Sequence, residues 1–235
     1  MNKETASALR RRVRLIIARL RKLYPSAKTA LKFEDPFQLL VSTVLSAQCT
    51  DARVNMVTPG LFRKLPTPQH FAAVNPRELE EEIRSTGFFR NKAKNIIAAS
   101  KSIVEKFGGE VPRTMEELLE LGGVGRKTAN CVLGGAFGIN EGIVVDTHVE
   151  RLSQRLGLSH QNTAEKVERD LMAIVPREDW YDFSNLLILH GRNVCIARRP
   201  LCPECTLRRL CPSADGFMRK FHSQRGVPQR RKQVG

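Results

Sequence analysis

Four of the six cysteines lie close together near the end of the chain, at Cys195, Cys202, Cys205 and Cys211. They occupy 17 residues in the spacing C-x6-C-x2-C-x5-C. Thiolates at such short spacings can converge on one inorganic centre. We expect an intracellular protein because no signal-peptide pattern precedes the first helical stretch, and intracellular thiols stay reduced. These features favour a metal site over two disulfides.

The identity of the metal stays open at the level of spacing. A structural four-cysteine zinc site usually has two C-x2-C pairs, whereas this chain has one. The spacing also differs from the C-x2-C-x2-C-x3-C run of bacterial ferredoxins.

A glycine-rich turn, Gly122-Gly123-Val124-Gly125, precedes a helical stretch that begins at Arg126. Glycine lets the backbone approach a ligand closely, and the free N–H groups of a first helical turn bind anions. In a basic protein the expected anion is a DNA phosphate. The alternative is a plain helix–turn–helix corner in which glycine serves only to make the turn tight.

Lys127 falls in the first turn of this second helical stretch. The positive end of the helix dipole disfavours an ammonium group there. A neutral amine is a nucleophile that can form a Schiff base with a sugar carbon. The alternative is that Lys127 only contacts phosphate through its charge.

Asp146 follows the apolar run Ile143-Val144-Val145, which should carry it to the edge of a core. Thr147 and Glu150 form a T-x-x-E capping box, so we expect Thr147 to cap the next helix. Asp146 would then be free to point elsewhere. A carboxylate near an amine and a sugar can stabilise positive charge at the anomeric carbon.

The charge of the chain is strongly unbalanced: 39 lysines and arginines against 24 aspartates and glutamates give a net charge of +15. Such an excess fits a polyanionic partner, because each neutralised phosphate releases counterions. A merely basic soluble protein is the alternative. Since no apolar run approaches the roughly 20 residues that span a bilayer, we expect no membrane partner.

The hydrophobic pattern predicts an all-α protein. Apolar residues at helical spacing from Leu9 to Leu23 predict an N-terminal helix, and residues 36–48 read as a buried helix. A further helix is predicted from Asn91 to Phe107, ended by glycine. A capping box at Thr114 predicts a short helix. From residue 213 onward the chain is basic with scattered apolar residues, and we expect a flexible tail over 213–235.

The chain resembles endonuclease III, a DNA glycosylase of the helix-hairpin-helix superfamily. The resemblance covers roughly residues 9–212 and includes the cysteine run. Its other motifs are Leu121-Gly122-Gly123-Val124-Gly125-Arg126-Lys127-Thr128-Ala129, Val145-Asp146-Thr147-His148, Leu45-Ser46-Ala47-Gln48-Cys49-Thr50-Asp51, Gly87-Phe88-Phe89-Arg90-Asn91-Lys92-Ala93 and Leu189-His190-Gly191-Arg192.

The resemblance implies an all-helical fold of two lobes. One lobe would be a six-helix bundle at about residues 30–140 that contains the helix-hairpin-helix. The other would combine residues 1–29 with residues 141–212 and hold one [4Fe-4S] cluster on the four cysteines. A monomer in the cytoplasm, associated with the nucleoid, is expected.

The resemblance also implies an activity on duplex DNA that contains damaged bases or abasic sites, with the damaged base flipped out. The expected enzyme is a bifunctional glycosylase and AP lyase that removes oxidised pyrimidines. By motif position Lys127 is the nucleophile and Asp146 the essential carboxylate. The expected DNA contacts are the gap-filling Gln48 and Phe88, the hairpin residues Gly123, Val124, Gly125 and Arg126, and the phosphate-binding Arg198 and Arg199.

Two residues depart from the family pattern. Gly122 replaces a proline and is expected to loosen the hairpin, and Phe88 replaces a leucine. One rival reading is the monofunctional adenine glycosylase branch, which lacks the nucleophilic lysine, so Lys127 argues against it. A second is a non-catalytic DNA-binding module with a structural zinc, which would bind DNA without nicking it.

Overall fold

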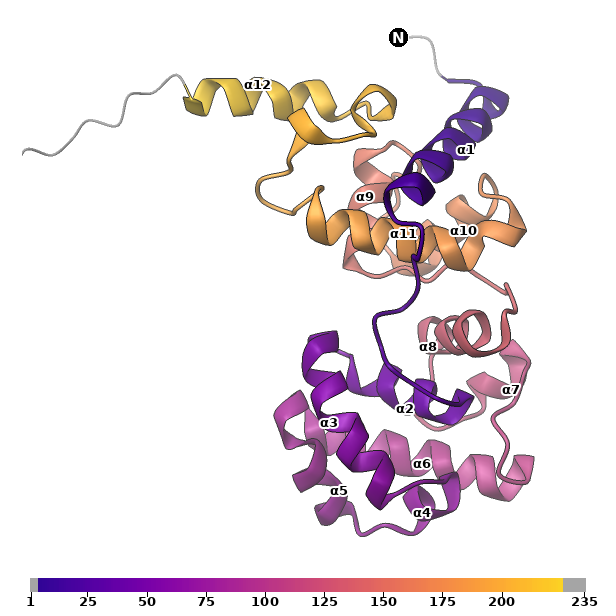
Figure 1. The fold of residues 1–235 in the computed structure, drawn as a ribbon. Helices are drawn as coiled ribbons and strands as arrows, with labels where there is room; N and C mark the ends of the chain where they lie inside the picture. Colours follow the sequence, from indigo (N-terminus) through magenta and orange to yellow (C-terminus); the bar gives the residue numbers. More distant parts are fainter. Residues whose placement is uncertain (1–3, 226–235) are drawn as a thin grey trace, which may run out of the picture. The chain divides into compact units, whose positions relative to one another are not determined.

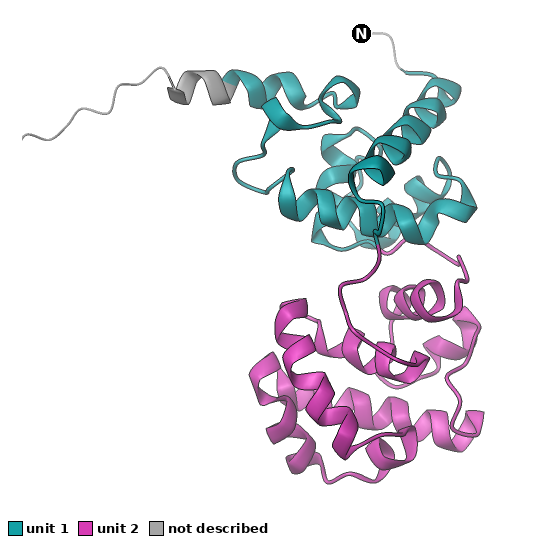
Figure 2. Ribbon diagram, viewed as in Figure 1, with its two compact units in different colours: residues 1–27, 145–235 teal, residues 28–144 magenta. Residues whose placement is uncertain are grey.

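The structure, a computed structural model, describes residues 4–225, with side chains described as far as residue 219. Every regular element in this range is a helix (Figure 1), so the predicted all-α class is confirmed. Within the same range no helix has both the length and the apolar character needed to cross a membrane. The chain divides into two compact units (Figure 2), one of residues 28–144 and one that joins residues 1–27 to residues 145–235.

The unit of residues 28–144 is built around a single hydrophobic core. Asp35 caps its central helix α2, because the carboxylate accepts the Gln38 amide, and Pro36 occupies the first helical position. Gly108 ends α6 in the left-handed conformation, as its position predicts. The helices of this unit are α2 Pro36–Leu45, α3 Asp51–Lys64, α4 Pro68–Ala73, α5 Pro76–Ile83, η1 Arg84–Thr86, α6 Phe89–Phe107, α7 Met115–Leu119, α8 Arg126–Val132 and the π-helical turn η2 Leu133–Phe137.

The second unit brings the N-terminal helix together with the C-terminal third of the chain. Val13, Ile16 and Leu20 of the predicted apolar stripe are buried, while the arginines between them face outward or reach the cysteine loop. Its helices are α1 Ala6–Leu23, α9 Thr147–Arg155, α10 Ala164–Met172, η3 Arg177–Asp179, α11 Trp180–Asn193, η4 Cys202–Glu204, η5 Arg208–Leu210 and α12 Ala214–Arg225.

Helix α12 corrects the prediction of a flexible tail from residue 213. The chain is helical over Ala214–Arg225. Ala214 is buried, and the Arg155 guanidinium lies 4.7 Å from the centroid of the Phe217 ring. The helix is therefore held by tertiary contacts that the scattered apolar residues did not reveal. Residues 226–235 of the predicted tail lie outside the described residues.

Candidate active site and cysteine cavity

A cavity of about 330 Å³ lies within the unit of residues 28–144 and is lined by four of the predicted site residues. Gln48 comes from the loop after α2, Phe88 from the residue before α6, Gly123 from the hairpin and Lys127 from α8. These positions are separated by up to 79 residues, from 48 to 127, so the fold alone brings them to one cavity. The remaining lining residues are Thr43, Val44, Ala47, Asn91, Lys92, Asn95 and Thr128.

The glycine hairpin holds Lys127 at this cavity. The Val124 amide donates to the Leu121 carbonyl at 3.1 Å, and Gly123 has a φ of +76°, which closes the turn. Gly125 is the N-cap of α8, and Lys127 is the second residue of that helix and exposed. The amine is thus presented to solvent from a rigid turn.

The hairpin is pressed against α6, which explains its glycines. A Cβ atom at Gly123 would lie 2.4 Å from Cγ of Asn95, and one at Gly122 would lie 2.6 Å from Cβ of Ala98. Side chains at either position would push the hairpin away from the helix. The glycine that replaces the family's proline therefore permits a close approach to Ala98.

Gln48 and Phe88 share an unusual backbone conformation. Among the described residues they are the non-glycine positions with positive φ, at 52° and 49°. The left-handed region costs such residues about 1–2 kcal/mol, and strain of this kind concentrates at functional sites. Phe88 is also 63 % exposed, so its ring is presented to solvent although burial would be favourable.

Lys92 has no role in the sequence-based prediction, yet it lines the same cavity. Its residue surface is only 4 % exposed, and its ammonium donates to the carbonyls of Leu45 and Thr86, each at 2.8 Å. Burial lowers the pKa of Lys92, and Cys49 partly opposes this shift. A sequence signal exists, because Lys92 falls on the apolar stripe of α6 four residues before Ile96.

Asp146 lies in the other unit, and its prediction requires a correction. Asp146 is itself the N-cap of α9, while Thr147 is the first helical residue. Oδ1 of Asp146 accepts the amides of His148 and Val149, both at 2.8 Å. A carboxylate also interacts with the helix dipole more strongly than a hydroxyl does. The carboxylate is therefore fixed in direction, half-buried, and not free to reorient.

Asp146 also acts on the side chain of His148. Burial lowers the pKa of His148, and the negative charge of Asp146 opposes that shift. The Arg151 guanidinium lies 3.1 Å from Nδ1 of His148, and its charge adds to the lowering. The start of α9 is thus a cluster of interacting charges around a capped helix end.

The four cysteines of the predicted metal site line one cavity of their unit. All four are free thiols and half-buried. Burial raises the pKa of Cys205 to about 11 and also raises the pKa values of Cys202 and Cys211, to which the neighbouring cysteines add. Among the described residues no three His, Cys, Asp or Glu side chains are gathered around a single ion position. The thiols instead line a cavity with largely apolar walls.

This donor set fits an iron–sulfur cluster, which is held by four cysteine thiolates. Burial disfavours the thiolate form of these cysteines, and a bound metal, whose charge deprotonates its cysteine ligands, offsets that cost. Two side chains lie within hydrogen-bond distance of the cysteine sulfurs. The guanidinium of Arg155 lies 3.2 Å from Sγ of Cys195, and Nε2 of His190 lies 3.3 Å from Sγ of Cys205.

Arginine side chains fasten the cysteine loop to the helices. Arg155 donates to the carbonyls of Ile196 and Ala197 at 3.0 and 2.6 Å. Arg12 reaches the Leu210 carbonyl at 3.1 Å, and Arg19 reaches the Thr206 carbonyl at 2.8 Å. A charged donor makes a stronger hydrogen bond to a carbonyl than a neutral donor does. Arg12 and Arg19 of α1 and Arg155 of α9 therefore hold the cysteine loop.

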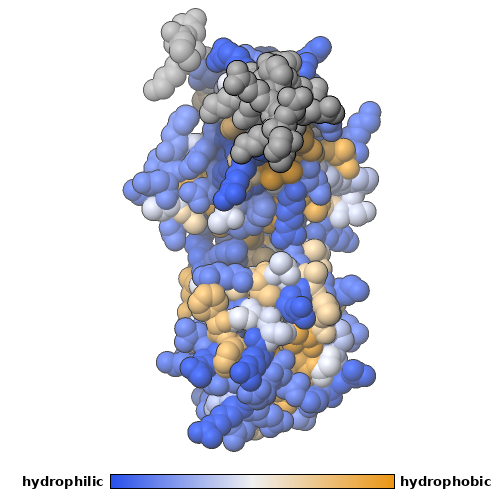
Figure 3. Space-filling model, turned by 90° about the vertical axis from the view of Figure 1, so that its left-hand side faces the viewer, coloured by the Kyte–Doolittle hydropathy of each residue, from blue (hydrophilic) through white to orange (hydrophobic). Residues whose placement is uncertain are grey.

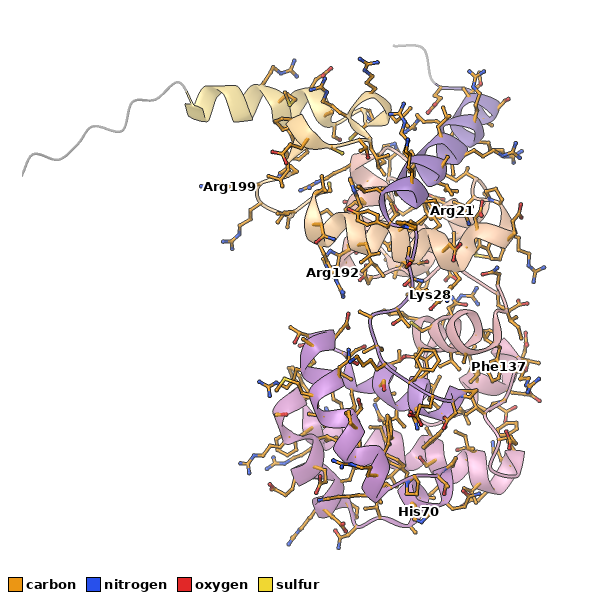
Figure 4. All side chains as sticks on the ribbon, in the orientation of Figure 1. Arg21, Lys28, His70, Phe137, Arg192 and Arg199 are labelled. Atoms are coloured by element: carbon orange, nitrogen blue, oxygen red, sulfur yellow. The ribbon has the colours of Figure 1, made fainter. Side chains whose placement is uncertain are left out.

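Arg198 and Arg199, the predicted phosphate contacts, are exposed on this loop. Figure 4 shows Arg199 extending away from the ribbon, and Arg192 at the end of α11 also extends outward. Hydrophilic side chains prevail on the face drawn in Figure 3, with smaller apolar patches between them. The net charge of +15, rather than hydropathy, is what suits a phosphate-rich partner.

Residues 41–177 match the family model described as HhH-GPD superfamily base excision DNA repair protein. The chain is 59 % identical over 199 residues to endonuclease III of Synechocystis sp. (strain ATCC 27184 / PCC 6803 / Kazusa), which covers 85 % of this chain and 91 % of that protein. The chain belongs to the endonuclease III family.

Two further comparisons agree with this membership. Endonuclease III of Bacillus subtilis (strain 168) is 50 % identical over 190 residues, covering 80 % of this chain and 86 % of that protein. A solved structure of a trapped endonuclease III–DNA covalent intermediate matches with a TM-score of 0.84 and 46 % identity, covering 89 % of this chain and 98 % of that one. The endonuclease III family carries a 4Fe-4S cluster, and several cysteines are present in this member.

Proposed function

We propose that Lys127 is the nucleophile, and Asp146 the supporting carboxylate, of a base excision repair enzyme that removes oxidised pyrimidines from duplex DNA. As an endonuclease III family member the chain is a bifunctional DNA glycosylase and AP lyase. The observation that carries the assignment is the cavity that Lys127 lines together with Gln48 and Phe88. It combines an exposed amine with two exposed side chains on strained backbone.

The reaction needs an amine and a carboxylate in separate roles. The lone pair of the Lys127 amine attacks C1′ of the flipped nucleotide, and the bond from C1′ to the base breaks with its electron pair leaving on the base. Ring opening gives a Schiff base between Lys127 and C1′. Loss of a C2′ proton then expels the 3′ phosphate, which nicks the strand, and water releases the lysine.

Asp146 supports this chemistry through its charge. Its carboxylate is held in one direction by two backbone amides, so it needs no reorganisation as positive charge develops on the sugar. We assign it that stabilisation and assistance in the proton transfers. A fixed carboxylate suits this role better than a mobile one.

The remaining assigned residues bind DNA. Gln48 and Phe88 fill the gap that the flipped nucleotide leaves, since both are exposed at the cavity. The hairpin residues Gly123, Val124, Gly125 and Arg126 and the loop residues Arg198 and Arg199 contact phosphates. Consistent with a net charge of +15, the partner is duplex DNA, and we place the protein with the nucleoid.

One [4Fe-4S] cluster is assigned to Cys195, Cys202, Cys205 and Cys211, supported by the cavity that all four thiols line. When bound, the cluster supplies a covalent connection between distant parts of the loop. Arg155, beside Cys195, would donate a hydrogen bond to a ligand sulfur. The residues Arg198 and Arg199 lie between the first two ligands, so an ordered loop presents them to phosphate.

A strand-cleavage assay on matched duplexes tests the activity. One duplex carries an oxidised pyrimidine, one an abasic site and one an oxidised purine. We expect a nick 3′ to the oxidised pyrimidine and to the abasic site without alkali treatment. Base release with an intact strand would instead indicate a monofunctional glycosylase, and binding without any product would indicate a non-catalytic module.

A further inference from the structure

Two loops of the unit formed by residues 28–144 end at Gln48 and Phe88. The first follows α2, where the amide of Cys49 donates to the Ser46 carbonyl at 3.1 Å. The second follows η1, where the Gly87 amide donates to the Arg84 carbonyl at 3.3 Å. Neither set of bonds connects one loop with the other, although both end residues line the same cavity.

Lys92 makes that connection. Its Nζ donates to the Leu45 carbonyl, three residues before Gln48, and to the Thr86 carbonyl, two residues before Phe88. Its own backbone amide donates to the Phe88 carbonyl at 3.1 Å. Lys92 thus holds the Phe88 loop from both its backbone and its side chain, and the Gln48 loop from its side chain.

The cost of burying this ammonium indicates that the contact matters. A buried charge is expensive even when it is hydrogen-bonded, and an apolar side chain would fill the same space more favourably. The ammonium here is satisfied by carbonyl oxygens at two loop ends. Both loops then lead into residues of left-handed backbone, a conformation that persists only when the surroundings impose it.

We propose that Lys92 is a positioning residue that clamps the Gln48 and Phe88 loops together and so sets the spacing of the two gap-filling side chains. The clamp rests on the proposed function, which assigns those side chains to the gap in the duplex. It adds a residue that touches neither DNA nor the reacting sugar. Its effect should appear only when a base pair must be opened.

The test compares Lys92→Met with the wild-type protein on two substrates. The variant keeps the length and apolar stem of the side chain and removes its donors. One substrate is a duplex with an oxidised pyrimidine, in which a gap must be filled. The other is a single strand with an abasic site, in which no gap exists. Lys101→Met, at an exposed position of the same helix, is the matched control.

We expect Lys92→Met to slow excision from the duplex by roughly tenfold to hundredfold, the range of lost charge-assisted hydrogen bonds. Nicking of the single strand should change by no more than about twofold, as for the control. Lys92→Arg, which can donate to both carbonyls, should restore most of the duplex rate. Hydrogen exchange should rise at residues 46–48 and 86–88 in Lys92→Met and not in the control.

An equal fall on both substrates, or no fall on either, would overturn the clamp. Should Lys92→Met not fold, Lys92→Gln takes its place, because its shorter amide cannot reach both carbonyls. The same loss of duplex excision relative to single-strand nicking is then expected. The outcome is separate from a failure of the proposed function. In that case the wild-type protein itself would nick neither substrate, or Lys127→Ala would nick both at the wild-type rate.

Discussion

The cavity at Lys127 and the cavity of the four cysteines differ in side-chain exposure, backbone conformation and charged hydrogen bonds. Around Lys127 the wall includes the exposed side chains of Gln48 and Phe88, both on strained backbone, and a glycine of the hairpin. Around the cysteines the groups are half-buried, and arginines donate to one loop carbonyl after another. The first region combines strained backbone with the groups that we propose to react and to fill the duplex gap, and the second uses charged hydrogen-bond donors to hold a loop in place.

This difference teaches where substitutions should act. Changes at exposed, strained positions should alter the reaction and leave the unfolding free energy nearly constant or raise it. Changes at the cysteines and at the arginines that bind their loop should lower the unfolding free energy, and activity should fall with the folded population and with the order of the loop that carries Arg198 and Arg199.

Lys127→Gln should reduce single-turnover nicking of an abasic duplex by on the order of a thousandfold or more, because the nucleophile is lost. Its unfolding free energy should change by no more than about 0.5 kcal/mol, since the side chain is exposed. Nicking kinetics measure the loss of rate, and thermal unfolding measures the change in stability. A large loss of stability would show that the Lys127 region, like the cysteine region, contributes to the unfolding free energy.

Cys205→Ser should act mainly on stability, whereas Lys127→Gln acts mainly on the nicking rate. A lost cluster ligand should lower the unfolding free energy by on the order of 3 kcal/mol or more. The visible absorbance of the cluster should fall as well. Denaturant unfolding and absorbance on the same sample check this. Cys131→Ser, at a half-buried cysteine of the other unit, is the control and should keep the absorbance.

Arg155→Met should lower the unfolding free energy by about 2 kcal/mol, because several loop carbonyls lose a charged donor. Arg198→Met, on the same loop but exposed, should leave stability within about 0.5 kcal/mol. Chemical denaturation of both variants measures the contrast. Equal losses would mean that exposure on this loop does not distinguish structural from surface arginines.

Arg198→Ala and Arg199→Ala should weaken DNA binding without preference for sequence. Each should reduce the slope of the logarithm of affinity against the logarithm of salt concentration by about 1, while the melting temperature stays unchanged. Fluorescence anisotropy over a series of salt concentrations measures the slope. An unchanged slope would remove these residues from the phosphate contacts.

Phe88→Asn should raise the unfolding free energy by about 0.5 kcal/mol, because asparagine tolerates left-handed backbone better than phenylalanine. The same change should slow excision from duplex DNA, because the gap loses its aromatic filler. Thermal unfolding measures the gain in stability, and excision kinetics measure the loss of rate. A fall in stability would argue that the ring is held by packing rather than presented under strain.

Sequence reasoning succeeded where a local signal decides the structure. Gly108 marks the end of α6, and Thr114 caps α7 by accepting the Glu117 amide. The cysteine spacing predicted one metal site; the four thiols line one cavity, and the bound metal itself stays a prediction. The motif positions of Gln48, Phe88 and Lys127 likewise meet at one cavity wall.

The failures came where two local signals competed or the cause was distant. Asp146 and Thr147 are adjacent capping residues, and only the helix register chooses between them. Helix α12 depends on contacts such as that of Phe217 with Arg155, 62 residues earlier by their numbers. Lys92 binds a carbonyl 47 residues away, a partner that helical periodicity does not name.

The central claim is that the amine of Lys127 carries the reaction. It is tested most directly by reducing the enzyme–DNA adduct with borohydride on an abasic duplex, digesting the trapped complex and locating the modified lysine by mass spectrometry. The account predicts a single sugar adduct on Lys127 and no trapped complex with Lys127→Ala. An adduct on another lysine, such as Lys92, or full trapping by Lys127→Ala would contradict it.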